Sequence, residues 1–243
     1  EWIDISNHIP PFDMGKAAFV LGNVWREFPP NTVHLIGVDT DWSKDTPYVI
    51  VKKDENYFIG TDNGFFSLLL HGEPADEVWT LRLEGDEDPK FPLKSIFIPA
   101  AARLLNGESP AGFSERVDRY KRRQSLQPVT AEGNIRGMVI YVDAYGNVIT
   151  NITRPFFEQF VGDKPFRILL RRGDHDLERI STTYGEVPPG DKVAIFNSAG
   201  YLEIAINRGV KGSGGGASEL LGLRENDIIR IEIDVDSPAG FGF

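Results

Sequence analysis

The 243-residue chain contains no cysteine, and this absence removes several kinds of chemistry together. Disulfide bonds, thiolate zinc sites, iron–sulfur clusters and cysteine nucleophiles all require that side chain. The four histidines, His8, His34, His71 and His175, show neither the spacing of a metal site nor that of a base–nucleophile pair. We therefore expect no metal, and a site built from oxygen and nitrogen groups.

Long hydrophobic runs and a basic charge are also missing. No apolar run approaches the roughly 20 residues that a membrane helix needs, and no signal peptide opens the chain. The 26 basic and 36 acidic side chains give a net charge of −10, whereas a nucleic-acid face needs clustered Lys and Arg. The one dense basic run, Arg116 to Arg123, contains an aspartate and is typical of a solvated linker. The sequence predicts a cytoplasmic protein with no membrane or nucleic-acid partner.

The composition is that of a globular protein with room for two domains. Hydrophobic residues make up 41% of the chain and charged residues 26%, which separates it from disordered sequences. At roughly 150 residues per domain, the length allows one large or two modest domains. The composition shifts in the polar stretch Gln124 to Gly133. We expect an N-terminal domain over residues 1–127 and a C-terminal domain over residues 128–243.

The first domain alternates helical and strand-like patterns. Apolar residues recur at helical spacing from Met14 to Phe28, with Asp13 where an N-cap would lie. Val33 to Val38 is a short apolar run typical of a buried strand. This alternation predicts an α/β domain with a central, mostly parallel sheet. The other expected elements are a strand-like start at 2–5, a hairpin of 48–52 and 57–60, and helices at 65–70 and 96–105.

The second domain shows one strand-like segment after another, separated mostly by glycine-containing turns. This pattern predicts an all-β, barrel-like domain. The glycine-rich Gly212–Gly216 stretch lacks a following Gly-Lys-Ser/Thr and indicates a surface loop rather than a phosphate loop. The tail from Asp234 to Phe243 carries no recognisable signal. The expected strands are 137–142, 147–150, 166–170, 192–196, 201–206 and 228–233.

Three short segments contain more Asp, Asn and Gly than packing requires. Asp62-Asn63-Gly64 is either a tight turn with an N-cap, or a ligand-binding carboxylate at the end of a strand. In Asp143 to Asn151, an acid, a ring and an amide could hold an amine, stack on a flat ring and bind a base edge. Asn197 to Ala205 is a polar turn between apolar strands, for which a simple hairpin suffices. Asp39 and Asp41 follow a predicted strand and are further candidate carboxylates.

Together these segments resemble the S-adenosylmethionine hydroxide adenosyltransferases, the family that also contains the fluorinase and the chlorinase. The matching segments follow one another in the family's order and spacing over nearly the whole chain. The resemblance is therefore specific, although each segment alone would be a weak match. It implies an N-terminal α/β domain, a C-terminal β-barrel and a homotrimer with active sites between subunits. The matching segments are 4–13, 28–34, 38–39, 57–58, 62–64, 143–151, Ser198, 200–207 and 220–223 with Asp227.

The resemblance also implies roles for individual residues around a nucleoside substrate, with no separate cofactor. Family members displace methionine from the 5′ carbon of S-adenosylmethionine with water or halide. Asp62 and Asn63 are included among the expected substrate-binding residues. Phe12 corresponds to an aromatic residue beside the sugar, Asp143 and Ser198 to groups that hold methionine, Asn147 to an adenine-binding amide, and Tyr145 and Tyr184 to rings that flank the nucleoside.

Departures from the family pattern fall on the groups proposed to activate water. Of the family's Asp–Arg–His set, Asp39 remains, while the arginine position holds Thr46 and the histidine position holds Pro92. Ser95 stands where the hydrolases have an acid, and Leu93 argues against a halide pocket. We expect the family's opening strand, whose Thr-Asp-Phe-Gly segment grips the ribose, to be missing before Glu1.

Two functional hypotheses remain open. In the first, the chain is a divergent enzyme that binds S-adenosylmethionine or a related 5′-substituted adenosine and acts at its 5′ carbon. Asp39, with Asp41 or Lys44, would replace the lost groups, and water would be the nucleophile, giving adenosine and methionine. In the second, it is a catalytically silent nucleoside-binding homologue. A structural role for the trimer alone has no support in the sequence beyond the catalytic losses.

Overall fold

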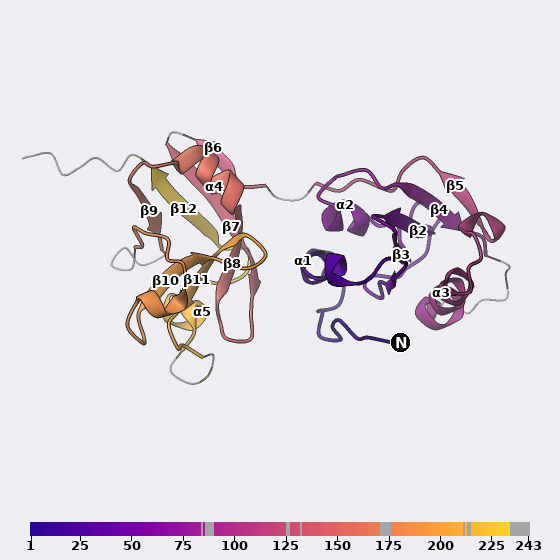
Figure 1. The fold of residues 1–243 in the computed structure, drawn as a ribbon, viewed down its shortest axis with the longest axis horizontal. Helices are drawn as coiled ribbons and strands as arrows, with labels where there is room; N and C mark the ends of the chain where they lie inside the picture. Colours follow the sequence, from indigo (N-terminus) through magenta and orange to yellow (C-terminus); the bar gives the residue numbers. More distant parts are fainter. Residues whose placement is uncertain are drawn as a thin grey trace, which may run out of the picture. The chain divides into compact units, whose positions relative to one another are not determined.

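The computed structural model describes residues 1–83, 85, 90–124, 127–131, 133–170, 176–210, 212 and 215–233. The chain forms two compact units, Glu1–Ser125 and Leu126–Phe243, each of which is described by itself (Figure 1). His175, the tail 234–243 and two residues of the Gly212–Gly216 stretch lie outside the described residues. No helix in the described ranges has the length and apolar character to cross a bilayer.

The N-terminal unit contains a five-stranded sheet in the order β1-β3-β2-β4-β5. β1 pairs with β3 in parallel, and every other pair among these five strands is antiparallel. The parallel pair brings the carboxyl ends of β1 and β3 to one edge, which is the feature that positions the candidate site. The strands are β1 (Val33–Leu35), β2 (Tyr48–Lys53), β3 (Asn56–Thr61), β4 (Glu77–Leu81) and β5 (Ser114–Val117).

The prediction of a mostly parallel sheet is therefore wrong, although the α/β class is confirmed. Continuous apolar runs are typical of parallel strands because helices cover both faces of such sheets. Here Val49 and Val51 of β2 pack on one side, whereas Tyr48 and Ile50 pack on the other. The apolar run reports that two faces are covered, and it carries no information on strand direction.

Helices cover both faces of this sheet (Figure 1). α1 (Met14–Gly22) and α2 (Phe65–Leu69) pack on one face, around the fully buried Trp25 and Phe58. α3 (Ile98–Leu105) packs on the other, where Phe97 meets the Tyr48 ring edge-on at 5.1 Å.

Several boundaries in this unit differ from those expected. α1 ends at Gly22 rather than at Phe28, because Gly22 and Asn23 are weak helix formers, and a 3-10 turn (Trp25–Glu27) follows. A π-helical turn (Leu93–Phe97) precedes α3. The strand expected at 2–5 is not formed: Trp2 and Ile3 are exposed and join no ladder among the described strands.

The C-terminal unit is an antiparallel sheet curved into a half-barrel, in the order β10-β11-β8-β7-β12-β9, with β6 paired to β7. The all-β prediction is correct for the strands, and two helices, α4 (Arg154–Val161) and α5 (Ala217–Leu220), were not expected. Ile135, Val139, Ile152 and Ile229 are among the fully buried residues of its core. The strands are β6 (Val129–Ala131), β7 (Asn134–Val142), β8 (Val148–Thr153), β9 (Phe166–Leu169), β10 (Lys192–Phe196), β11 (Tyr201–Ile206) and β12 (Ile228–Ile233).

His34 is a core residue of the N-terminal unit, as its apolar strand indicates. Its ring stacks on Phe58 at 4.9 Å and meets Phe28 edge-on, and Nε2 has no hydrogen-bond partner among the described residues. Burial lowers the pKa of His34 from 6.5 to about 4. The neutral imidazole is therefore the form that the folded state accepts.

This burial predicts a loss of stability in acid that is specific to His34. Below pH 6.5 the unfolded chain protonates this residue, whereas the folded chain keeps it neutral down to about pH 4. The contribution of His34 to the free energy of unfolding thus falls by about 2 to 3 kcal/mol between about pH 7 and about pH 4.5. Urea unfolding of wild type and His34→Phe at both pH values measures this difference. If His34→Phe loses as much free energy of unfolding in acid as the wild type does, His34 is not the residue responsible. His8→Phe, at an exposed histidine, is the control.

Candidate functional site

Two of the expected polar segments meet at the carboxyl edge of the parallel pair. Asp39 follows β1, and Asp62 and Asn63 follow β3. The Asn63 amide donates from Nδ2 to the Asp39 carbonyl (2.9 Å) and to its Oδ2 (3.3 Å). Asn63 Oδ1 in turn accepts the backbone N–H of Phe65 at the start of α2 (3.1 Å). The Asp39 carboxylate is therefore held by an amide whose own orientation is fixed by a helix.

Asp39 also has an unusual backbone conformation. Its φ is 52°, in the left-handed region that non-glycine residues seldom adopt. Such conformations persist where the surrounding structure imposes them, and they are frequent at functional sites. Phe12 shares this feature, with φ at 64° in the turn closed by Asp13 N–H and the Pro10 carbonyl (3.2 Å). Its ring is 71% exposed, which leaves it available to a ligand.

Asp62 lies half-buried beside Asn63. Burial raises the pKa of its carboxyl group, and a hydrogen bond from the Lys121 backbone N–H (2.7 Å to Oδ1) opposes the rise together with the Lys121 charge. The N-cap residue of α2 is Gly64, which no side chain caps, and Asn63 accepts the Phe65 N–H from the position before it. Asp62 instead connects the strand end to the basic segment that follows β5.

The positions that depart from the family pattern serve local structure. Thr46 Oγ1 lies 2.7 Å from Ser43 Oγ and 3.3 Å from the Asp41 carbonyl, within the loop after Asp39. Pro92 is buried at the start of the π-helical turn, where Ser95 Oγ donates to the Phe91 carbonyl (2.9 Å). These side chains contribute hydroxyls and a ring, but no imidazole or guanidinium group.

In the C-terminal unit, the turn between β7 and β8 forms a compact polar cluster. Asp143 Oδ1 accepts the backbone N–H groups of Tyr145 (2.9 Å) and Asn147 (2.8 Å), and its Oδ2 accepts Asn147 Nδ2 (3.0 Å). Asn147 is only 9% exposed, whereas the Tyr145 ring is 61% exposed. The hairpin is therefore held by hydrogen bonds to its own aspartate, with the Asn147 amide fixed and the Tyr145 ring exposed to solvent.

A second polar cluster in this unit contains Glu203, which the sequence pattern did not predict as a site residue. The Tyr184 hydroxyl donates to Glu203 Oε1 (2.6 Å), and Asn197 Nδ2 donates to Glu203 Oε2 (3.2 Å). Ser198 lies exposed in the turn that Asn197 begins. The signal that could have identified Glu203 is a lone charged residue inside the apolar strand Tyr201–Ile206.

The charge of Asp143, in the hairpin cluster, acts on the Tyr184 phenol of the second cluster. Burial raises the pKa of Tyr184, and the hydrogen bond to Glu203 and the charges of Glu203 and Asp143 raise it further. Tyr184 therefore remains a protonated donor at neutral pH. Asp143, Tyr145 and Asn147 lie in one hairpin, and the charge of Asp143 acts on the Tyr184 phenol.

The tight turn at the hairpin predicts a sensitive glycine. Gly216 lies against the turn, and a Cβ there would come within 2.7 Å of Gly146 Cα and closer still to the Tyr145 carbonyl oxygen. We expect Gly216→Ala to lower the free energy of unfolding by about 1 to 3 kcal/mol through overpacking. Gly185→Ala, at a glycine with open space around it, is the matched control and should leave stability unchanged. Equal denaturation midpoints for both variants would show that the turn is not constrained.

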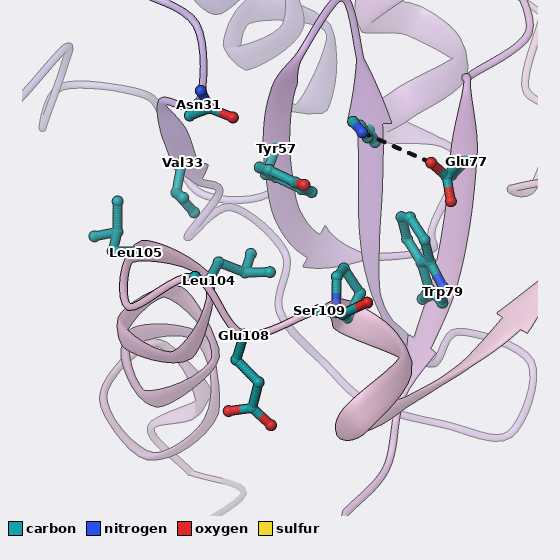
Figure 2. Close-up of a pocket in the computed structure, with 12 residues that line it drawn as sticks. Asn31, Val33, Tyr57, Glu77, Trp79, Leu104, Leu105, Glu108 and Ser109 are labelled. Atoms are coloured by element: carbon teal, nitrogen blue, oxygen red, sulfur yellow. Dashed lines mark ion pairs between the residues drawn. The ribbon is translucent and has the colours of Figure 1, made fainter.

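A cavity of about 460 Å³ lies elsewhere in the N-terminal unit (Figure 2). Val33 and Tyr57, near the starts of β1 and β3, line it, so it lies at the edge opposite to Asp39. Its charged groups include Lys52 and Glu77, which pair with each other at 3.7 Å (Figure 2). None of the expected site residues lines this cavity. Within the described residues, no group of three or more His, Asp or Glu side chains could hold a metal ion.

Comparison with known proteins gives consistent matches to both units. Residues 1–114 match the family described as SAM hydroxide adenosyltransferase N-terminal domain, and residues 137–230 match the corresponding C-terminal domain. The chain is 31% identical over 240 residues to the (R)-S-adenosyl-L-methionine hydrolase of Thermus thermophilus, covering 94% of this chain and 87% of that protein. It is 28% identical to the protein of the same name from Salinispora tropica, covering 94% and 85%.

Solved structures also resemble the chain. An uncharacterized conserved protein from Thermotoga maritima superposes with a TM-score of 0.81 at 29% identity, covering 96% of this chain and 89% of that one. A conserved hypothetical protein from Thermus thermophilus gives a TM-score of 0.69 at 28% identity, covering 95% and 86%.

Proposed function

Because the chain belongs to the S-adenosylmethionine hydroxide adenosyltransferase family, we propose that it hydrolyses S-adenosylmethionine to adenosine and methionine. The observation that carries the proposal is the Asp39 carboxylate, held by the Asn63 amide at the carboxyl edge of the parallel pair. An oriented carboxylate of this kind can position a water molecule and take its proton.

The proposed reaction is a displacement at the 5′ carbon. The oxygen of water forms a bond to C5′ while the bond from C5′ to the sulfonium sulfur breaks, and the electron pair goes to sulfur. Water loses one proton, which Asp39 accepts and passes to solvent. The sulfonium is already a good leaving group, so the protein has to supply alignment and a desolvated slot.

The remaining site residues are proposed to bind the two ends of the substrate. The Asp143 carboxylate suits the methionine amino group, since the three hydrogen bonds that it accepts leave acceptor capacity unused, and Ser198 adds a hydroxyl. Asn147 suits the adenine edge. Further proposed contacts are Tyr145 and Tyr184 on the faces of the nucleoside, Phe12 beside the sugar, and Asp62 with Asn63 at the strand edge.

We also propose that the chain assembles as a homotrimer in which active sites form between subunits. Exposed apolar side chains in the first residues, including Trp2 (65%) and Ile3 (57%), are compatible with a partner surface. Light scattering coupled to size exclusion measures the assembly, and a monomeric mass would exclude it.

The function is tested by incubating the protein with S-adenosylmethionine and separating the products by chromatography. Adenosine and methionine should appear in equal amounts and in proportion to enzyme concentration. Absence of product above the blank, at high enzyme concentration, would reject the hydrolase.

A catalytically silent nucleoside-binding protein is the second candidate. It is supported by Thr46, Pro92 and Ser95, whose side chains form local contacts and supply no strong base or guanidinium cation. It predicts binding of adenosine in calorimetry without turnover of S-adenosylmethionine.

A further inference from the structure

Glu203 is a charged residue in the interior of the C-terminal unit. It lies in the middle of β11 and is only 4% exposed. Its neighbours across the sheet are Ile195 on β10 and Ile149 on β8. Burying a carboxyl group among apolar strands is costly unless hydrogen bonds compensate, and an apolar residue at the same position would usually be as stable or more so.

The partners of Glu203 come from two different turns. One carboxyl oxygen accepts the hydroxyl of Tyr184, and the other accepts Asn197 Nδ2. Asn197 Oδ1 accepts the backbone N–H groups of Ala199 and Tyr201, both at 3.1 Å. The carboxyl group thus ties the 3-10 turn that carries Tyr184 (Tyr184–Glu186) to the turn that carries Ser198.

The Tyr184 ring is the part of this network that a ligand can reach. It is 40% exposed, while the hydroxyl is anchored at Glu203. A ring whose polar end is fixed loses little further freedom when a flat ligand stacks on it, and such preorganisation improves affinity. The charge of Asp143 also acts on this phenol, so the anchored ring belongs to the same region as the Asp143 hairpin.

We infer that Glu203 is a positioning residue for nucleoside binding, which holds the Tyr184 ring and the Asn197 turn in their ligand-binding arrangement. The inference rests on the proposed function, since the ligand is the adenosine part of the proposed substrate. Glu203 touches no substrate in this scheme and acts through Tyr184 and Asn197.

The test is a double-mutant cycle with adenosine as the probe, measured by calorimetry on the full chain. Tyr184→Phe keeps the ring and removes the hydroxyl that Glu203 holds, and Glu203→Gln replaces the acceptor facing Asn197 with a donor. We expect each substitution to weaken adenosine binding about 10-fold. Because both substitutions act on one network, the double variant should bind adenosine with the same affinity as the single variant that binds it less tightly. Glu158→Gln, at an exposed glutamate of α4, is the control and should bind as wild type does.

The outcomes separate this inference from the proposed function. Failure of the wild type to bind adenosine rejects the proposed function, and the inference with it. If the wild type binds adenosine but the double variant loses affinity by the product of the two single losses, the inference is rejected and the proposed function is not. If Glu203→Gln does not fold, Tyr184→Phe decides, because an unchanged dissociation constant in that variant overturns the positioning role.

A spectroscopic readout distinguishes positioning from general support of the fold. Alkaline titration of tyrosine absorbance, taken as the difference from Tyr184→Phe, isolates the Tyr184 phenol. Its pKa should fall in Glu203→Gln and stay unchanged in Glu158→Gln. An unchanged titration in Glu203→Gln would show that the carboxyl group does not hold the phenol.

Discussion

Asp39→Asn is expected to lower kcat for S-adenosylmethionine hydrolysis by about 100- to 10,000-fold, the usual contribution of a general base. The substitution preserves shape, and the new amide can still turn its oxygen toward Asn63 Nδ2, which now donates to Asp39 Oδ2 at 3.3 Å. Binding should therefore change little, so the loss should appear in kcat rather than in KM. Steady-state rates of adenosine release measure both constants.

Asp45→Asn is the matched control for this prediction. Asp45 is an exposed aspartate in the same loop, and its variant should retain wild-type kcat. Asp41→Asn tests the other candidate carboxylate of the loop. If Asp41→Asn loses activity and Asp39→Asn does not, the base has been assigned to the wrong aspartate.

Asn147→Ala should weaken adenosine binding by about 10- to 100-fold. Asn147 is almost fully buried, and truncation removes its amide along with the bond from Nδ2 to Asp143 Oδ2 (3.0 Å). Loss of hydrogen bonds in such a site costs about 1 to 3 kcal/mol, which corresponds to this range of dissociation constants. Calorimetric titration with adenosine gives the dissociation constant directly.

The control for Asn147 is Asn134→Ala, at the opposite end of β7. Asn134 is equally buried and accepts a hydrogen bond from Arg230 Nε (3.0 Å). Both variants should lose similar stability, while Asn134→Ala alone should keep adenosine affinity. Retained affinity in Asn147→Ala would remove this residue from the site.

The sequence predicted elements well where turn chemistry and apolar patterning agreed. β10, β11 and β12 begin and end at the expected residues, because their apolar runs are bounded by polar turns such as Asn197–Gly200. α4 was missed because its eight residues lie between strands, and Pro155 was not used as a helix-start signal. Strand direction in the N-terminal sheet depends on connections across the fold, which local patterns do not encode.

The same limit applies to the candidate site. Asp39, Asp62 and Asn63 were each expected after a strand, but their meeting at one edge depends on the parallel pairing of β1 and β3, which the sequence pattern does not encode. Glu203 could not be grouped with Tyr184, because 19 residues separate them and the bond depends on how the strands fold back. The role of Asp143 as a brace for its own turn is likewise visible only once the hairpin is closed.

β7 has a consequence for how the candidate site of the C-terminal unit withstands thermal fluctuation. Its residues Asn134–Met138 pair with β12, and the strand also pairs with β6 and then with β8. Amides held on both edges of a strand exchange their hydrogens with solvent only when the surrounding sheet opens as a whole. The Asp143–Asn147 hairpin directly follows the end of this strand. The hydrogen bonds to Asp143 therefore form again whenever the sheet closes. The proposed adenine end of the site therefore extends from a strand that its neighbours hold in the sheet, and its Asp143–Asn147 hydrogen bonds form without a ligand.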